Sequence, residues 1–182
     1  LKNLKKKKIP FKICKGNVLN EIHEVKKGDG TPFKVFTPYW RCAEKHYMEK
    51  IPPKEKIIKK CSRKKNYLQN CIDPSEILPK NNWFKNFDKI WSPSEENALN
   101  ELQNFIKSRI KNYSEGRNFP NITGTSKLSP FIKFGQIHVE TIWRECMIAK
   151  NKTIGTSKFL AEIGWREFNH TLINHFPHML KN

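Results

Sequence analysis

The period of the hydrophobic positions changes along the chain and divides it into two parts. Apolar and polar residues alternate over residues 11–14 and again over 33–36, as they do in half-buried strands. A loop rich in glycine and proline over 28–32 separates the two stretches, and residues 39–41 are predicted to open a short helix. So few strands cannot form a complete sheet. Residues 1–50 are therefore expected to be the last piece of a larger α/β domain.

From Trp91 onward, hydrophobic residues recur every three or four positions, which predicts helices. Ser92 can cap the first of them, Pro93 suits its first position, and Glu95 completes a capping box. Its buried face is predicted to consist of Ala98, Leu99, Leu102, Phe105, Ile106, Ile110 and Tyr113. Three further helices are predicted, namely Ser129 to near Gly135, a third marked by Val139, Ile142, Trp143, Cys146 and Met147, and a fourth from near Ser157 to about His175. The second half is expected to be all-α.

Residues 51–82 have the composition of a linker. They combine Pro52-Pro53, a lysine-rich stretch, Asp73-Pro74 and Pro79, and they show neither a helix period nor a strand period. The predicted fold class is therefore mainly α, with a few strands before the linker.

The charge of the chain is strongly positive. Lys and Arg number 35 against 17 Asp and Glu, which gives a formal charge of +18. Such a surplus attracts nucleic acid, an anionic membrane or an acidic protein. Much of it lies in runs such as Lys5–Lys8 and Lys54–Lys60, so solvated loops without a binding role are an alternative.

Composition also excludes several classes of protein. Hydrophobic residues make up 37 % of the chain, enough for a core and against wholesale disorder. No apolar run approaches the roughly 20 residues that cross a bilayer, and no apolar signal region follows the N-terminal lysines. The five cysteines include no C-x-x-C pair, so we expect reduced thiols in the cytoplasm and no metal site.

One candidate site is a loop rich in hydroxyl groups. Tyr113 and Arg117 precede Thr125-Ser126-Lys127-Leu128-Ser129-Pro130, which leads into a predicted helix. Free backbone N–H groups at a helix start, together with hydroxyl donors, favour a phosphate or diphosphate. Plain N-capping by Ser129, with no ligand, is the alternative.

A second candidate site lies on the last predicted helix. Glu162, Trp165, Arg166 and Asn169 fall on one helical face. A carboxylate, an indole and a guanidinium together suit recognition of a base or a flat cofactor. An ordinary surface pair between Glu162 and Arg166, four residues apart, is the alternative.

Five separated motifs agree in order and spacing with one family. They are Trp91-x-Pro93-x-Glu95, Tyr113-x-x-x-Arg117, Thr125-Ser126-x-Leu128-Ser129-Pro130, Phe134-Gly135 and Glu162-x-x-Trp165-Arg166-Glu167-Phe168. Over nearly its whole length the chain resembles the DNA photolyase/cryptochrome family. The resemblance implies the C-terminal end of an α/β antenna domain over 1–50, with its last strands, an interdomain linker over 51–90, and the first half of the helical FAD-binding domain over 91–182.

The resemblance also implies roles for individual residues. The expected FAD-binding residues are Tyr113, Thr125, Ser126, Leu128, Ser129, Phe159 and Arg166. Glu162 and Trp165 match residues that line the cavity for a flipped-out pyrimidine dimer and are expected to be catalytic. Arg117 matches a basic position near the DNA path, so it is expected to contact DNA together with Glu162 and Trp165. Phe159 stands where many relatives have Trp, and Asn169 replaces a common Tyr.

The activity implied by the resemblance is light-driven repair of cyclobutane pyrimidine dimers by electron transfer from reduced FAD. UV-damaged DNA is the expected partner of a monomer that does not bind membranes, and an antenna chromophore of folate or deazaflavin type is compatible with the family. A cryptochrome-like blue-light sensor and a basic nucleic-acid-binding helical module without a cofactor are the alternatives. Because other flavin-site residues of the family are expected after Asn182, the chain alone is expected to bind FAD weakly or not at all, as an inactive fragment.

Overall fold

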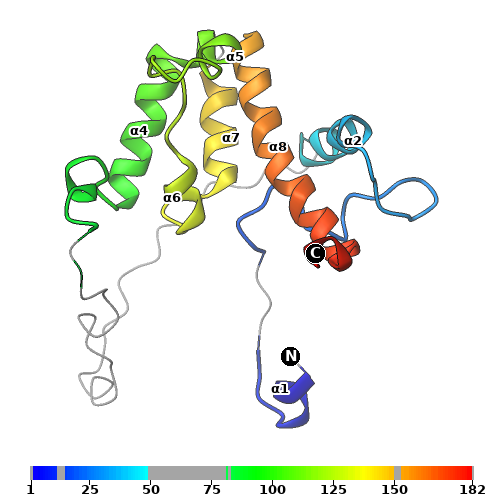
Figure 1. Ribbon diagram of the computed structural model, residues 1–182. Helices are drawn as coiled ribbons and strands as arrows, with labels where there is room; N and C mark the ends of the chain where they lie inside the picture. Colours follow the sequence, from blue (N-terminus) through cyan, green and yellow to red (C-terminus); the bar gives the residue numbers. More distant parts are fainter. Residues whose placement is uncertain (1, 12–14, 49–80, 82, 150–152, 182) are drawn as a thin grey trace. The chain divides into compact units, whose positions relative to one another are not determined.

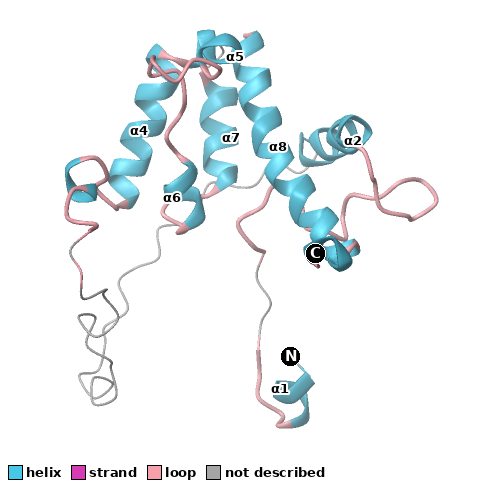
Figure 2. Cartoon of the chain, in the orientation of Figure 1, coloured by secondary structure: helices cyan, strands magenta, loops and turns pink. Residues whose placement is uncertain are grey.

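The computed structural model describes residues 2–11, 15–48, 81, 83–149 and 153–181, and within these ranges all regular structure is helical (Figures 1 and 2). The α-helices are α1 (Lys2–Lys6), α2 (Phe36–Met48), α4 (Glu95–Ser108), α5 (Tyr113–Gly116), α6 (Ser129–Lys133), α7 (Val139–Ile148) and α8 (Ile154–His175). Short 3-10 helices are η2 (Phe87–Lys89), η3 (Ile110–Asn112) and η4 (Pro177–Leu180). The mainly-α prediction is confirmed.

The strand predicted over residues 33–36 is wrong. Residues 33 and 34 are irregular, and helix α2 begins at Phe36. Pro38 is tolerated there because N–H groups in the first turn have no partner within a helix. The pattern that predicts this helix is the spacing of Tyr39, Ala43 and Tyr47, which lie four residues apart and are buried. It was overlooked in favour of the short alternation over residues 33–36. Of the other predicted strand, residues 12–14 lie outside the described residues, as do most of the predicted linker residues.

Helix α4 begins two residues later than predicted. Its cap is Ser94, not Ser92, and the Ser94 side chain accepts a hydrogen bond from the backbone N–H of Asn97 at 3.0 Å. The predicted face is buried at Ala98, Leu102, Phe105, Ile106, Ile110 and Tyr113. Leu99 is the exception, with 43 % of its surface exposed.

The other helices of the second half lie close to where they were predicted. Helix α7 buries Val139, Ile142, Trp143 and Cys146. Burial raises the pKa of the Cys146 thiol to about 12, which keeps it protonated and inert. Helix α8 starts three residues before Ser157, where the Thr153 side chain accepts from the N–H of Thr156 at 3.1 Å.

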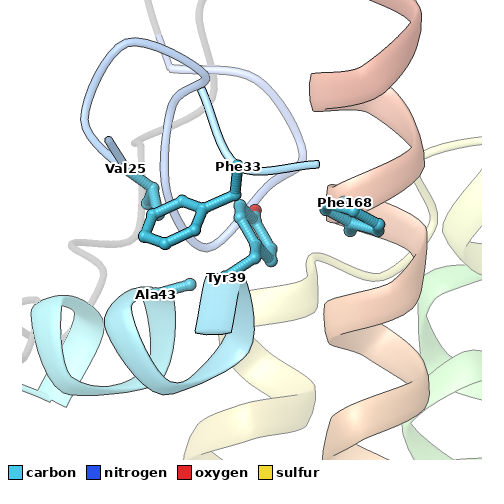
Figure 3. Packing of buried hydrophobic residues seen from close by; sticks show 5 residues of the cluster. All are labelled: Val25, Phe33, Tyr39, Ala43 and Phe168. Atoms are coloured by element: carbon cyan, nitrogen blue, oxygen red, sulfur yellow. The ribbon is translucent and has the colours of Figure 1, made fainter. Parts of the chain in front are cut away.

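Helix α8 is the element on which the others pack. It contacts α2, α5, α7, η3 and η4, and Figure 1 shows α7 and α8 side by side. At its far end Phe168 joins a buried cluster with Val25, Phe33, Tyr39 and Ala43 (Figure 3). The N-terminal segment 15–48 is therefore packed onto the same helix as the second half.

Two compact units emerge from the contacts within the chain. One combines residues 1–50 with 93–182, and the other spans 51–92. The division of the family's domains at residues 50 and 90 stays a prediction. Within the described ranges, no helix has the length and apolar character that crossing a membrane requires.

Gly155 sets how closely α8 approaches η3. A Cβ atom at this position would lie 1.9 Å from the carbonyl oxygen of Ile110 and 2.7 Å from that of Lys111. Backbone atoms cannot move away as the end of a flexible side chain can. Because Tyr113 follows η3 directly, this contact also places the first predicted FAD-binding residue.

Glu167 ties α8 to residues 19 and 20. Its carboxylate is buried and accepts hydrogen bonds from the backbone N–H of Leu19 and, at 3.4 Å, from that of Asn20. Burial raises the pKa of Glu167 to about 7, although both N–H groups act to lower it. The carboxyl of Glu167 therefore holds its proton to a higher pH than an exposed glutamate does.

We expect Gly155→Ala to lower the free energy of unfolding by about 1–3 kcal/mol, because η3 must move away from α8. Thermal denaturation followed by circular dichroism measures this. Gly28→Ala is the matched control, since nothing lies within 4 Å of the added carbon there. An equal loss of Tm in both variants would contradict the role of close packing at Gly155.

Glu167 should make the chain less stable as the pH rises. Its pKa in the folded chain, about 7, lies above the ordinary 4.5, so between these values the folded state holds more protons than the unfolded state. The stabilising contribution of the protonated form is complete below the ordinary pKa and is lost as the pH passes through 7.

Replacing Glu167 by Gln removes this titration and keeps an acceptor for the Leu19 N–H. The variant should therefore gain stability over the parent as the pH rises from about 5 to 8, by roughly 2–4 kcal/mol. Denaturation curves at both pH values test this, with Glu44→Gln on the exposed side of α2 as the control. A constant difference between parent and Gln variant would show that Glu167 does not titrate in this range.

Candidate functional site

A cavity of about 600 Å³ lies where α5, α6 and α8 meet. Its lining residues are Tyr113, Ser126, Ser129, Ile132, Lys133, Phe159, Glu162, Ile163, Arg166 and His170. Six of these were predicted as site residues from the sequence, namely Tyr113, Ser126, Ser129, Phe159, Glu162 and Arg166. The structure thus brings together the two candidate sites, which are far apart in the sequence.

Four predicted site residues do not line the cavity. Thr125 lies exposed on the loop before α6, and Leu128 is buried in the core. Arg117 and Trp165 lie outside the lining and make contacts of their own. The functional roles of all four stay predictions.

One corner of the cavity is built around an ion pair. The Arg117 guanidinium pairs with the Glu162 carboxylate and lies over the Tyr113 ring, 5.8 Å from its centroid. Lys158 Nζ is 3.9 Å from the same carboxylate. The surface pair between Glu162 and Arg166, offered above as the alternative, is therefore wrong, because Glu162 is paired with a residue of another segment.

The ring of Tyr113 is held by aromatic contacts. It meets Phe159 edge-on at 5.3 Å between centroids and Phe105 at 5.6 Å. Burial is the main reason why the pKa of Tyr113 lies above its ordinary value, with Arg117 acting against it. Tyr113 is thus a neutral hydroxyl group beside the ion pair.

The loop before α6 differs from the N-capping alternative. The residue at the cap position is Leu128, and Ser129 is the first residue of the helix, so Ser129 does not cap it. Helix α6 has only five residues, so its dipole adds little to anion binding. The groups that this loop can still offer to an anion are the hydroxyl groups of Ser126 and Ser129, which line the cavity.

Arg166 is held from outside the cavity. Its Nη1 donates to the backbone carbonyl of Asn17 at 2.8 Å. The Asn17 side chain in turn donates to the carbonyl of Ile132 at 3.1 Å and accepts from the N–H of Val139 at 2.9 Å. Asn17 therefore links Arg166 to both α6 and α7, and it fixes the orientation of the guanidinium.

Trp165 has a different environment from its neighbour. Its ring stacks on Phe36 of α2, with 3.9 Å between centroids and 10° between planes, and 41 % of its surface is exposed. Phe36 thus covers one side of the indole. The ring lies at the surface and is not among the residues that line the cavity.

Sequence reasoning missed Asn17, Lys133 and His170. Lys133 and His170 line the cavity four residues after Ser129 and Arg166, respectively, so helical spacing could have found them. Burial, together with the charges of Arg166 and Lys133, holds the pKa of His170 below its ordinary value. No comparable signal points to Asn17, because its partners lie far along the chain.

Within the described ranges, no group of three or more His, Cys, Asp or Glu side chains could hold a metal ion. The cavity lining offers hydroxyl groups, basic side chains, a paired carboxylate and aromatic rings. These suit an anionic ligand with a flat ring system.

Comparisons with known proteins agree with this picture. A family model described as DNA photolyase matches residues 1–56. A deoxyribodipyrimidine photo-lyase of Agrobacterium fabrum is 36 % identical over 173 residues, covering 90 % of this chain and 35 % of that protein. One of Alkalihalophilus pseudofirmus is 36 % identical over 167 residues, covering 91 % and 34 %.

A crystal structure of a bacterial class III photolyase from Agrobacterium tumefaciens matches with a TM-score of 0.76 and 31 % identity. The match covers all of this chain and 38 % of that one. The chain thus spans about a third of the length of the curated relatives named above. From the agreement of sequence and structure over nearly its whole length, the chain belongs to the DNA photolyase family.

Proposed function

We propose that this chain supplies residues that hold FAD and contact the lesion in a photolyase that repairs cyclobutane pyrimidine dimers in DNA. The observation that carries the proposal is that one cavity gathers six residues predicted as FAD or lesion contacts from three segments of the chain. Relatives along 90 % of the chain are named deoxyribodipyrimidine photo-lyases, which supports the same activity.

The cavity residues fit FAD by their chemistry. Ser126 and Ser129 offer hydroxyl donors and Arg166 offers guanidinium N–H groups, which suit phosphate oxygens. Phe159 and Tyr113 offer aromatic surface for a ring system. When bound in its reduced form, FAD supplies the electron for light-driven repair, and the chain supplies binding, orientation and exclusion of water.

Glu162 and Trp165 are the residues that would contact the lesion. In this role the Glu162 carboxylate accepts hydrogen bonds from the damaged bases, and its ion pair with Arg117 holds the carboxylate in place. Because Phe36 covers one side of Trp165, a base would stack on the other side of the indole. The formal charge of +18 supports binding to the phosphates around the lesion.

Glu162→Ala should reduce the preference for UV-irradiated over unirradiated DNA by about tenfold, since an acceptor for the flipped bases is lost. Its FAD affinity should change little. Both quantities are measured by equilibrium titration, the first with fluorescent oligonucleotides at fixed salt. Glu115→Ala is the matched control, because it removes an exposed carboxylate of α5 that does not line the cavity.

Three results would contradict this assignment. An unchanged preference in Glu162→Ala would remove Glu162 from the lesion contact. A parent chain that binds both DNAs equally and shows no binding even of millimolar FAD would favour a basic nucleic-acid-binding module. A parent that binds FAD but shows no preference for irradiated DNA would favour a blue-light sensor.

A further inference from the structure

One end of the cavity contains two residues, Lys133 and His170, that neither the sequence motifs nor the proposed lesion contact includes. Lys133, Arg166 and His170 line this end, two from α8 and one from α6. Each helix contributes residues four apart, Ser129 with Lys133 and Arg166 with His170. Side chains so spaced lie on one helical face, so the two helices present matching rows to the same space.

The lining residues also differ in character along α8. Phe159 and Glu162 come first in sequence, then Arg166, then His170. At a rise of 1.5 Å per residue, Phe159 and His170 are about 16 Å apart along the helix. The cavity therefore suits an elongated ligand in which an anionic group follows a ring system, as the diphosphate of a dinucleotide does.

No carboxylate among the lining residues offsets the charge at the basic end. Glu162 is the one acidic residue of the lining, and it is paired with Arg117. Glu167, the neighbour of Arg166 in sequence, directs its carboxylate to the backbone of Leu19 and Asn20. Arg166 uses one guanidinium nitrogen for Asn17 and has further N–H groups for a ligand.

The position of His170 adds a titratable group to this end. The charged groups that act on its imidazole are Arg166 on its own helix and Lys133 on α6, both cationic. Together with burial they disfavour protonation, so the pKa of His170 lies below its ordinary value. An anion placed among the three side chains would reverse this balance and favour the imidazolium form.

We propose that Lys133 and His170 act with Arg166 as a phosphate-binding wall for the dinucleotide, and that binding of the phosphate brings a proton onto His170. This inference rests on the proposed function, since it takes FAD as the ligand of the cavity. It adds to that function two binding residues and a dependence on pH, with tighter binding expected on the acidic side of neutrality.

The phosphate could belong to a dinucleotide or to the DNA backbone. The dinucleotide is favoured because the same cavity carries aromatic rings and hydroxyl groups beside the basic end. The test therefore compares FAD, which carries phosphate, with riboflavin, which carries none, and with an undamaged oligonucleotide.

The direct test follows the imidazole signals of the chain by NMR as the pH is varied. The chain has six histidines, and the signal that disappears in His170→Asn identifies His170. Saturating FAD should raise the pKa of His170 by about one unit or more. Riboflavin at the same concentration, and the oligonucleotide, should leave it unchanged.

A second variant tests the contribution of Lys133 to FAD binding and leaves His170 unchanged. Lys133→Gln should weaken FAD binding about tenfold, the effect of one charge-assisted hydrogen bond, and should leave riboflavin binding unchanged. Lys107→Gln is the matched control, because it removes an exposed lysine from the last turn of α4, outside the cavity.

The outcomes separate this inference from the proposed function. If FAD binds while the pKa of His170 stays the same, or Lys133→Gln binds FAD as Lys107→Gln does, the wall is refuted and FAD binding stands. If the oligonucleotide raises the pKa of His170, the phosphate is that of DNA and the assignment to the dinucleotide is wrong. Millimolar FAD is used because the chain alone is expected to bind FAD only weakly. If FAD at this concentration perturbs none of the cavity signals, both the proposed FAD site and the wall are refuted.

Discussion

The attachment of the N-terminal segment to α8 is the interaction on which the rest of the structure depends. Two consecutive residues make it. Arg166 donates to the carbonyl of Asn17, and Glu167 accepts from the N–H of Leu19. A buried carboxylate is costly when unpaired, and Glu167 is buried with backbone N–H groups as its partners. Because Asn17 also bonds to α6 and α7, one short segment ties α6, α7 and α8 together.

The attachment of the N-terminal segment also makes the two ends of the cavity differ in charge. At one end of the cavity Glu162 lies near the cationic groups of Arg117 and Lys158. At the other end, no carboxylate of the lining lies beside the basic side chains of Lys133, Arg166 and His170. Since Glu167 is turned towards the backbone of the N-terminal segment, it does not neutralise the basic end. The hydrogen bonds that attach the N-terminal segment to α8 thus leave the positive charges at this end free to bind an anionic ligand.

Local patterns predicted the helices well and their long-range partners poorly. The faces of α4 and α7 follow from residues three and four apart, which adjacent sequence contains. The strand predicted over 33–36 failed because a short alternation also fits the start of an amphipathic helix, and the packing of Tyr39 against Phe168 decided between them. Six of the residues singled out by the motifs line one cavity. Helical spacing suggested that Glu162 pairs with Arg166, but the fold supplies Arg117 instead, a partner that spacing along one helix cannot reveal.

The N-terminal segment therefore has a larger part in the site than its sequence suggests. Phe36 supports the indole of Trp165, and Asn17 orients the guanidinium of Arg166, although neither residue lines the cavity. Trp165 and Arg166 are adjacent in sequence, and they contact the N-terminal segment at two separate points. A shift of this segment relative to α8 would thus displace the proposed lesion contact and the proposed cofactor contact together. The packing of Phe33, Tyr39 and Ala43 near Phe168 opposes such a shift. The buried cluster would therefore contribute to the proposed function by keeping the site residues in place, without contacting a ligand itself.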